Sequence, residues 1–288
     1  MTASLTPLAL TCAALLAAGY GLIAALSLAP ATRAQARGLW PILLTETVIV
    51  GAVVTALWLG GPVLRAALAL MALRVGYEAA RVILRARPEL ALTVGVALML
   101  ASQGAATLPF VPTAAFALLA WGAALAIKLA KYRGPWLDMA VFPALPLSLF
   151  VAFALNGGAA TLLAAFLLVE IFDSFALLGG KLFGRTPIFP RLSPRKTVEG
   201  LATGTIMLMA LAALLGPPII NVPVSTGIAA ACLTGILAVA GDLAASRLKR
   251  SASVKDYPAI LPHQGGLLDI TDAWIATGAG FALVTALS

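Results

Sequence analysis

The side chains best suited to chemistry gather near the carboxyl end of the chain, between positions 242 and 272. Asp242, Ser246 and Lys249 are spaced i, i+4 and i+7, so a helix would present all three on one face. Asp269 and Asp272 follow at i, i+3, where the next apolar run begins. Carboxylate oxygens are good Mg²⁺ ligands, and cations beside them can take up the charge of phosphate oxygens. This stretch therefore indicates a site that holds a metal ion against a polyphosphate.

Two of these aspartates lie at facing ends of consecutive apolar runs that one loop joins. We expect Asp242 and Asp269 to share a Mg²⁺ ion, with Asp256 of the loop as a direct or water-mediated ligand. The pattern leaves room for a second cation. The loop ends in Gly265 and Gly266, whose backbone amides could approach a ligand closely. Zinc is not expected, because no cysteine and no second histidine lie nearby.

A second polar group closes the apolar run 158–179. Glu170, Asp173 and Ser174 stand at i, i+3 and i+4, hence on one face of a helix. Two acids and a hydroxyl on one face favour a polar cavity. A solvated end of a membrane span is the alternative.

The segment 179–200 contributes cations. Ser193 followed by Pro194 predicts a helix that begins here, with Ser193 as its N-cap. Arg195 and Lys196 would then lie in the first turn, where positive charge opposes the helix dipole. A bound phosphate would explain this basic pair, and the ordinary positive charge of a cytoplasmic loop is the alternative.

The elements that must position these residues are membrane helices. The chain of 288 residues is 61% hydrophobic and 10% charged, with a mean hydropathy of +1.03, whereas soluble domains carry about 25% charged residues. We predict an all-α, polytopic membrane protein with about ten transmembrane helices, or roughly eight at the least. The first apolar run is long and follows no basic residue, so we expect a span rather than a cleaved leader. The predicted spans are 5–29, 40–60, 62–80, 89–109, 111–130, 136–156, 158–179, 200–220, 223–245 and 267–287.

The third run leaves two alternatives open. It contains Arg65, Arg74 and Glu78, so it either spans the membrane or lies in the interface as an amphipathic helix. Arg74 and Glu78 are spaced i, i+4, and we expect them to form a neutralising ion pair rather than a site.

Basic residues divide the loops into two groups. When the runs are threaded alternately, the loops 30–39, 81–88, 131–135, 180–199 and 246–266 fall on one side of the membrane. All Lys and Arg residues except Arg65 and Arg74 lie in or next to these loops. The positive-inside rule makes that side cytoplasmic and places both termini outside. This asymmetry and contact with anionic lipid account for the net charge of +8, so nucleic-acid binding is not expected.

Acidic residues are concentrated in the second half of the chain. We therefore divide the protein into an N-terminal transmembrane scaffold, 1–135, and a C-terminal catalytic transmembrane half, 136–288. Cys12 and Cys232 both lie inside apolar runs, so neither a disulfide framework nor a thiolate metal site is expected.

Three motifs of the C-terminal half resemble those of the phosphatidate cytidylyltransferases, also called CDP-diacylglycerol synthases. The longest runs from Ser246 to Asp272 and resembles the pattern S-x-x-K-R-x(4)-K-D, then a proline, a His-Gly-Gly element and L-D-R-x-D. Residues 173–185, D-S-F-A-L-L-G-G-K-L-F-G-R, are similar to D-T-x-A-Y-x-x-G-[KR]-x-F-G-[KR]. Residues 193–200, S-P-R-K-T-V-E-G, are similar to S-P-K-K-T-x-E-G. The N-terminal half agrees with the family only as a series of apolar spans.

The resemblance implies that CTP and phosphatidic acid, or a related lipid phosphate, give CDP-diacylglycerol and pyrophosphate. It also implies an enzyme of the lipid bilayer, here a bacterial inner membrane, that acts at the cytoplasmic face and holds a metal on Asp242 and Asp269. The oligomeric state is left open, a homodimer included. The residues expected to carry catalysis are Asp242, Asp269, Lys249, Arg250 and Lys255. The residues expected to bind substrate are Ser193, Arg195, Lys196, Ser246, Asp173, Gln264, Gly265 and Gly266.

Two positions depart from the family pattern. Gln264 stands at the usual histidine of Gly-His-Gly-Gly, and Ile270 replaces the arginine of L-D-R-x-D. The loss of a cation near a polyphosphate could cost about 2–4 kcal/mol of transition-state stabilisation. We favour an active nucleotidyltransferase. The alternatives are a slow enzyme, a paralogue acting on another lipid phosphate, an inactive scaffold, and a transporter of an anionic lipid or solute.

Overall fold

The protein is almost entirely helical, as its composition predicts. The computed structural model describes residues 2–28, 30, 33–130, 134–190, 192–260 and 265–288. The N-terminal part contains α1 (Thr2–Leu28), α2 (Arg33–Leu59), α3 (Gly61–Ile83), α4 (Pro88–Ala105) and α5 (Phe110–Leu129). A broken helix follows, made of α6 (Pro135–Met139), η1 (Ala140–Ala144), α7 (Leu145–Phe153) and η2 (Ala154–Gly158). The C-terminal part contains α8 (Ala159–Phe183), β1 (Pro187–Phe189), β2 (Ser193–Thr197), α9 (Val198–Ile220), α10 (Val224–Ser251) and α11 (Leu267–Leu287).

The helices have the length and composition of membrane spans. Within the described part of the chain, eight segments are long and apolar enough to cross a bilayer. One of them, Pro135–Phe183, is interrupted where Asn156 and Gly157 leave the helical conformation, Gly157 with a φ of 103°. Each predicted apolar run overlaps a helical segment of the structure. The all-α polytopic fold is therefore confirmed, with the number of spans at the lower end of the predicted range.

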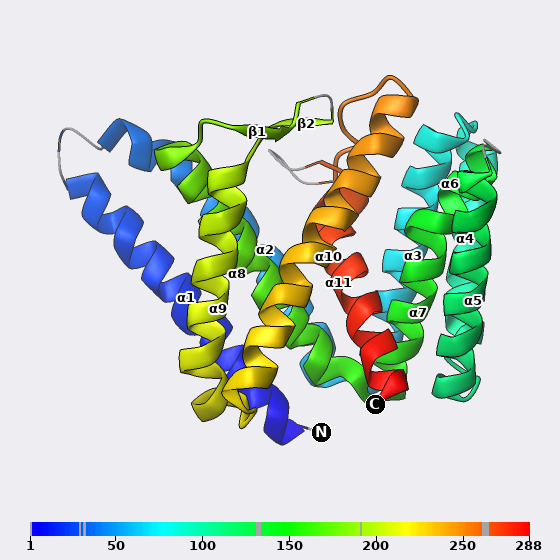
Figure 1. Cartoon of the computed structure of the whole chain (residues 1–288), viewed down its shortest axis with the longest axis horizontal. Helices are drawn as coiled ribbons and strands as arrows, with labels where there is room; N and C mark the ends of the chain where they lie inside the picture. The colour runs from blue at the N-terminus through cyan, green and yellow to red at the C-terminus, as the bar shows by residue number, and fades with distance from the viewer. Residues whose placement is uncertain (1, 29, 31–32, 131–133, 191, 261–264) are drawn as a thin grey trace.

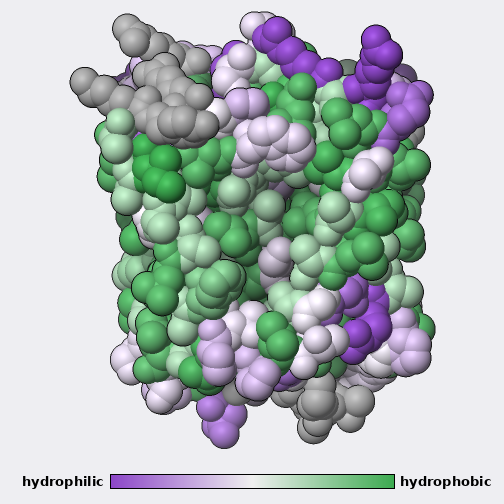
Figure 2. Space-filling model, turned by 90° about the vertical axis from the view of Figure 1, so that its right-hand side faces the viewer, coloured by the Kyte–Doolittle hydropathy of each residue, from purple (hydrophilic) through white to green (hydrophobic). Residues whose placement is uncertain are grey.

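The outer surface supports the same conclusion. Figure 2 shows apolar residues over the middle height of the molecule and hydrophilic residues gathered toward its upper and lower ends. Phe116, Leu119 and Leu129 of α5 are among the most exposed large apolar side chains, at 72%, 73% and 77%. Soluble proteins rarely expose apolar patches of this extent, whereas a bilayer covers them.

The third apolar run forms α3, a helix inside the bundle. It is not among the eight candidate spans. It packs mainly against α4, where Gly76 and Gly95 allow close backbone contact, since a Cβ at Gly76 would lie 2.9 Å from the Gly95 Cα atom. It also contacts α2, α10 and α11, and its Glu78 side chain is 0% exposed. A helix lying in the interface would leave such a charge in water, so the structure favours the interior placement.

The connections fall on two sides of the bundle. In Figure 1 the first helix begins and the last helix ends at the lower edge, whereas the β1–β2 hairpin and the C-terminal end of α10 lie at the upper edge. This arrangement agrees with the alternating threading predicted from the basic loops. The upper edge is also where the polar residues of the C-terminal half come together.

The segment 193–197 is a strand, so the prediction of a helix N-cap at Ser193 is wrong. β2 pairs antiparallel with β1, and α9 begins only at Val198. Thr197 is the residue that caps α9, its Oγ1 accepting a hydrogen bond from the Gly200 amide at 3.1 Å. Both hydroxyl residues can cap a helix, and pairing with β1 decides between them. Pro194 is compatible with the strand because an edge strand does not need every amide.

Small residues bring α10 and α11 together. At Gly241 a Cβ would lie 2.5 Å from the Asp272 carbonyl oxygen and 2.8 Å from the Ala276 Cβ. Farther along α11, the Trp274 indole donates a hydrogen bond to the Leu162 carbonyl of α8 at 2.9 Å and packs edge-on against Phe150 of α7, with 4.7 Å between ring centroids. These contacts fix the two helices that carry most of the polar residues.

Candidate active site

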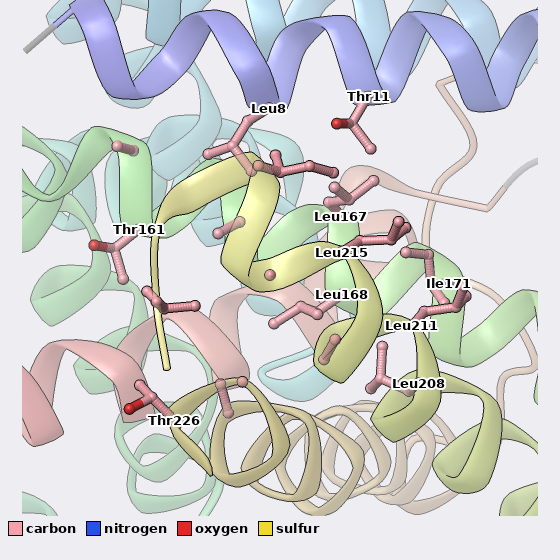
Figure 3. Close-up of a pocket in the computed structure, with 18 of the residues that line it drawn as sticks. Leu8, Thr11, Thr161, Leu167, Leu168, Ile171, Leu208, Leu211, Leu215 and Thr226 are labelled. Atoms are coloured by element: carbon pink, nitrogen blue, oxygen red, sulfur yellow. The ribbon is translucent and has the colours of Figure 1, made fainter. Parts of the chain in front are cut away.

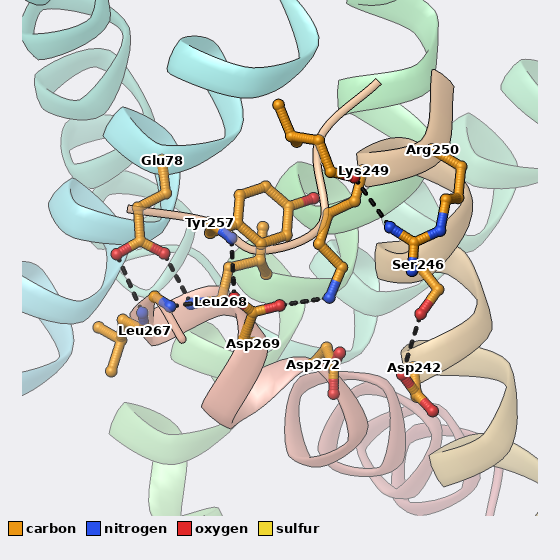
Figure 4. Close-up of polar contacts among 12 residues, drawn as sticks. Glu78, Asp242, Ser246, Lys249, Arg250, Tyr257, Leu267, Leu268, Asp269 and Asp272 are labelled. Carbon is orange, nitrogen blue, oxygen red and sulfur yellow. Dashed lines mark hydrogen bonds and ion pairs between the residues drawn. The ribbon is translucent and has the colours of Figure 1, made fainter. Parts of the chain in front are cut away.

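The polar face of α10 is formed as predicted. Ser246 Oγ donates a hydrogen bond to Asp242 Oδ1 at 3.3 Å, one helical turn apart. Lys249 extends from the same face and forms an ion pair with Asp269 of α11. Figure 4 shows these side chains pointing into the space between the two helices. The i, i+4, i+7 spacing therefore gives a continuous polar stripe that faces α11.

Asp269 is held by contacts on both of its carboxylate oxygens. Oδ2 accepts hydrogen bonds from the backbone amides of Tyr257 at 2.9 Å and Gly266 at 3.0 Å, while Oδ1 faces Lys249. The carboxylate thus closes the first turn of α11 and ties the loop after α10 to it. One oxygen is used by the backbone, and the other is directed toward the charged side chains of α10.

The hairpin brings a lysine to the other aspartate. Lys196 Nζ lies 2.5 Å from Asp242 Oδ2, so β2 and α10 are joined by an ion pair. The hairpin itself is anchored by Glu199, whose carboxylate accepts hydrogen bonds from the amides of Arg185 and Thr186 at 3.1 and 3.2 Å and from the Thr186 hydroxyl at 2.9 Å. The polar cluster therefore contains two aspartate–lysine pairs contributed by β2, α10 and α11.

Two further acids complete the cluster. Asp173 of α8 interacts electrostatically with Lys196 and Asp242. Asp272 of α11 is only 6% exposed and interacts electrostatically with Asp242, Lys249 and Asp173. Asp173 itself is exposed, and that it faces a polar cavity stays a prediction. Asp272 was outside the predicted site set, although its i, i+3 spacing from Asp269 was a signal that could have included it.

Glu78 makes contacts that no pattern in the sequence indicated. It forms the expected ion pair with Arg74 at 2.7 Å. Its carboxylate also accepts hydrogen bonds from the backbone amides of Leu267 and Leu268, at 2.9 Å each. The Arg74 guanidinium donates a second hydrogen bond to the Pro258 carbonyl at 2.9 Å. Figure 4 shows Glu78 at the beginning of α11, on the side opposite Lys249. A residue of the predicted scaffold thus contacts the backbone at the start of α11.

Tyr257 forms an uncharged wall next to Asp269. Its side chain is 2% exposed, and Lys249 Nζ lies 5.6 Å from the centroid of its ring. Burial, reinforced by the neighbouring Asp269 carboxylate, raises the pKa of the phenol above its usual range. The Tyr257 side chain is therefore neutral at physiological pH and adds no charge to the cluster.

The two carboxylates suit a Mg²⁺ ion that binds together with the phosphates of a ligand. Within the described ranges, no group of three or more His, Cys, Asp or Glu residues is arranged to hold a metal by itself. Mg²⁺ is commonly bound by one or two carboxylates together with phosphates and water, so a complete protein cage is not required. Asp242 and Asp269 supply hard oxygen ligands of this kind, and lysines balance their charge.

Comparison with known proteins assigns the chain to a family. A family model described as "Cytidylyltransferase family" matches residues 41–288. The chain belongs to the cytidylyltransferase family. The match includes α3 and most of α2 as well as the whole C-terminal half, so the family extends beyond the three motifs.

Individual relatives match over shorter stretches. The chain is 38% identical over 127 residues to "Uncharacterized protein YnbB" of Escherichia coli (strain K12), and the aligned stretch covers 44% of this chain and 43% of that protein. It is 43% identical over 109 residues to "Phosphatidate cytidylyltransferase 4, chloroplastic" of Arabidopsis thaliana, covering 37% and 27%. It is 38% identical over 132 residues to "Phosphatidate cytidylyltransferase" of Thermotoga maritima, covering 44% and 49%. The chain thus spans less than half the length of these relatives.

Among the described residues, several predicted site residues of this cytidylyltransferase family member form no ion pair or hydrogen bond with Asp242 or Asp269. Arg195 is exposed on β2, next to Lys196 in sequence. Arg250 donates to the Val254 carbonyl at 2.9 Å instead of to a carboxylate. Lys255 and Asp256 are exposed, and among the described residues neither forms an ion pair. Ser193 is half-buried in the same strand as Arg195.

The glycines before α11 are packed tightly. A Cβ at Gly265 would overlap the Asp269 carboxylate, and one at Gly266 would overlap Glu78 and Tyr257. Their lack of a side chain therefore allows the loop to close on the two acids. Gln264, one of the two departures from the family pattern, lies outside the described residues.

Ile270, the other residue that departs from the family pattern, lines an apolar groove. Ile270 lies in the wall of a groove of about 770 Å³ between α2, α3 and α11, which Arg74 also lines. A second apolar cavity of about 330 Å³ lies between α1, α8, α9, α10 and α11, and Figure 3 shows leucine, isoleucine and threonine side chains around it. Asp242, Asp269 and Asp272 line neither of these two spaces.

Proposed function

We propose that the protein transfers the cytidylyl group of CTP to phosphatidic acid, or to a closely related lipid phosphate, and releases CDP-diacylglycerol and pyrophosphate. The observation that carries the proposal is the pair of aspartate–lysine contacts, Asp242 with Lys196 and Asp269 with Lys249. Membership of the cytidylyltransferase family and the names of the relatives support the same reaction.

The proposed reaction is an in-line displacement at phosphorus. An oxygen of the lipid phosphomonoester attacks the α-phosphorus of CTP, a new P–O bond forms, and the bond to the oxygen that bridges the α- and β-phosphorus atoms breaks. Pyrophosphate leaves with the electron pair of that bond. The second pKa of a phosphomonoester is about 6, so the attacking oxygen is already deprotonated at neutral pH. The protein therefore needs to orient the reactants and stabilise charge rather than abstract a proton.

The residues of the cluster divide these tasks. Mg²⁺, when bound, would supply charge neutralisation at the phosphate oxygens, and Asp242 and Asp269 are the residues that would hold it. Lys196 and Lys249 lie beside these carboxylates, so phosphate oxygens entering the cluster would meet both ammonium groups. Ser246 would donate a hydrogen bond from the same face of α10.

The surrounding surface would provide further cations and the membrane orientation. Arg250 and Lys255 extend from the same edge of the molecule, where they would attract CTP or the lipid headgroup. The concentration of basic loops at this edge supports a cytoplasmic orientation of the site in a bacterial inner membrane.

The proposal is tested by incubating the purified protein, in lipid nanodiscs, with CTP, Mg²⁺ and a panel of lipid phosphates. Mass spectrometry identifies any liponucleotide, and a coupled assay measures pyrophosphate. We expect stoichiometric CDP-lipid and pyrophosphate, and loss of both when Mg²⁺ is chelated with EDTA. An anionic-lipid transporter or an inactive scaffold would release no pyrophosphate with any lipid phosphate, and that result would reject the proposed reaction.

A further inference from the structure

Glu78 of α3 is a fully buried acid that contacts the beginning of α11 across a large sequence distance. Its side chain is 0% exposed, Oε1 accepts the Leu267 amide and Oε2 accepts the Leu268 amide, both at 2.9 Å. These two residues immediately precede Asp269. Arg74, one turn earlier on α3, donates to Glu78 at 2.7 Å and to the Pro258 carbonyl at 2.9 Å. One pair on α3 therefore holds both the loop after α10 and the start of α11.

Glu78 supplies hydrogen-bond acceptors to backbone amides at the start of α11. The first amides of a helix have no partner within the helix, and leaving them unpaired in a buried position is costly. Glu78 satisfies two of these amides, and Asp269 Oδ2 satisfies the amide of Gly266. Bonds to an ionised carboxylate are stronger than bonds between neutral groups. Two acids from different helices thus define the first turn of α11.

The packing leaves little freedom at this point. Gly266 fits between Glu78 and Tyr257, so closely that a Cβ there would overlap both. Tyr257 in turn donates its amide to Asp269 Oδ2. Because Oδ2 is occupied by these backbone donors, Oδ1 is the oxygen directed toward Lys249. A displacement of the first turn of α11 would therefore rotate Asp269 Oδ1 away from the polar cluster.

We propose that Glu78 and Arg74 are positioning residues that hold Asp269 in the orientation needed to bind the metal–nucleotide complex. This inference rests on the proposed function, because Asp269 is assigned there to the site of CTP. The pair does not touch the cluster itself: the backbone of Leu267 and Leu268 lies between. Small displacements of groups that hold a substrate lower the rate strongly, so an indirect contact of this kind is enough to affect turnover.

The first test is Glu78→Gln. A glutamine side chain offers one acceptor oxygen, and its amide group would face the second backbone N–H. We expect kcat/KM for CTP to fall about tenfold or more, as for partners that orient metal ligands, and the Mg²⁺ concentration for half-maximal activity to rise. Asp138→Asn is the matched control, because it breaks an ion pair with Lys128 away from the site. The control is expected to change neither quantity more than about twofold.

A second measurement does not depend on turnover. Hydrogen exchange of wild-type protein without nucleotide is followed in peptides covering 266–270 and, for comparison, in the first turn of α4, whose N-cap makes no side-chain hydrogen bond. We expect slower exchange at the start of α11, and faster exchange there in Glu78→Gln with no change elsewhere. If the wild type makes no CDP-lipid, the proposed function fails while this measurement still tests the contact.

Failure of this inference can be distinguished from failure of the proposed function. The inference is overturned if folded Glu78→Gln keeps wild-type exchange at 266–270, or if kcat/KM and the Mg²⁺ requirement are unchanged in an active protein. A purely structural role would lower the melting temperature and the yield but leave the Mg²⁺ requirement of the folded fraction unchanged. If Glu78→Gln does not accumulate, Arg74→Gln carries the test. It loses the Pro258 contact, and we expect about a threefold or larger loss of kcat/KM, whereas wild-type values would overturn the inference.

Discussion

At the scale of single residues, each aspartate proposed to hold the metal has its own lysine. Asp242 is paired with Lys196 and Asp269 with Lys249, although the members of each pair come from different elements. Partly buried carboxylates next to lysines are balanced before any ligand arrives. Under the proposed function, a metal ion would replace the lysines beside the aspartates, and phosphate oxygens would replace the aspartates beside the lysines. Each charged group would then keep a partner of opposite charge when the nucleotide binds.

The lysine of β2 is expected to matter far more than its neighbour. Lys196→Ala removes the cation beside Asp242, and we expect kcat/KM for CTP to fall about 30-fold or more, the scale of one lost electrostatic contact in a transition state. Arg195→Ala removes an exposed charge of the same strand that forms no ion pair among the described residues. Pyrophosphate release by the two variants gives the comparison. Equal losses would show that both cations bind substrate, as the sequence motif alone suggests.

At the scale of elements, close packing of α10 against α11 brings polar residues of the two helices together, as the ion pair of Lys249 with Asp269 shows. Gly241 precedes Asp242 directly, and its missing side chain allows the backbone of α11 to approach. The hairpin contacts α8 and α9 and contributes Lys196, which pairs with Asp242 of α10. The position of the site is thus determined by where two helices and a short β-hairpin meet, rather than by any one motif.

Replacing Gly241 tests the helix junction. In Gly241→Ala the new Cβ would lie 2.5 Å from the Asp272 carbonyl oxygen, so we expect destabilisation of about 1–3 kcal/mol through overpacking. The free energy of unfolding in detergent measures this. Gly122→Ala in α5 is the control, since a Cβ at Gly122 would have no described atom of a neighbouring element within 4 Å, and helix propensity alone should make the change neutral or stabilising. A stable Gly241→Ala variant would contradict the close approach of the two helices.

The position of the β1–β2 hairpin is expected to depend on Glu199. Glu199→Gln weakens the hydrogen bonds to Arg185 and Thr186 that hold the base of the hairpin. We expect a loss of activity of about tenfold, because Lys196 is then less well positioned. Combined with Lys196→Ala, the second change should add little in a double-mutant cycle. Additive effects on kcat/KM would show that Glu199 does not act through Lys196.

At the scale of the whole molecule, the sequence predicted what periodicity and composition can encode. Apolar runs located the helices, and the spacing of Asp242, Ser246 and Lys249 placed them on one face of α10. The sequence could not distinguish Ser193 from Thr197 as a helix cap, because both types can cap and a tertiary strand pairing decides. The contact of Glu78 with α11 was also inaccessible, since no local pattern links groups so far apart in the chain.

The most direct test of the central claim compares Asp242→Asn, Asp269→Asn and the control Asp138→Asn in the CDP-lipid assay. Each change removes one negative charge from a lysine–aspartate pair, but only the first two pairs lie in the cluster. We predict that both cluster variants fold, remain in the membrane and lose at least about 100-fold in kcat, while Asp138→Asn keeps wild-type turnover. Activity within about threefold of wild type in either cluster variant would contradict a shared metal–nucleotide site on α10 and α11.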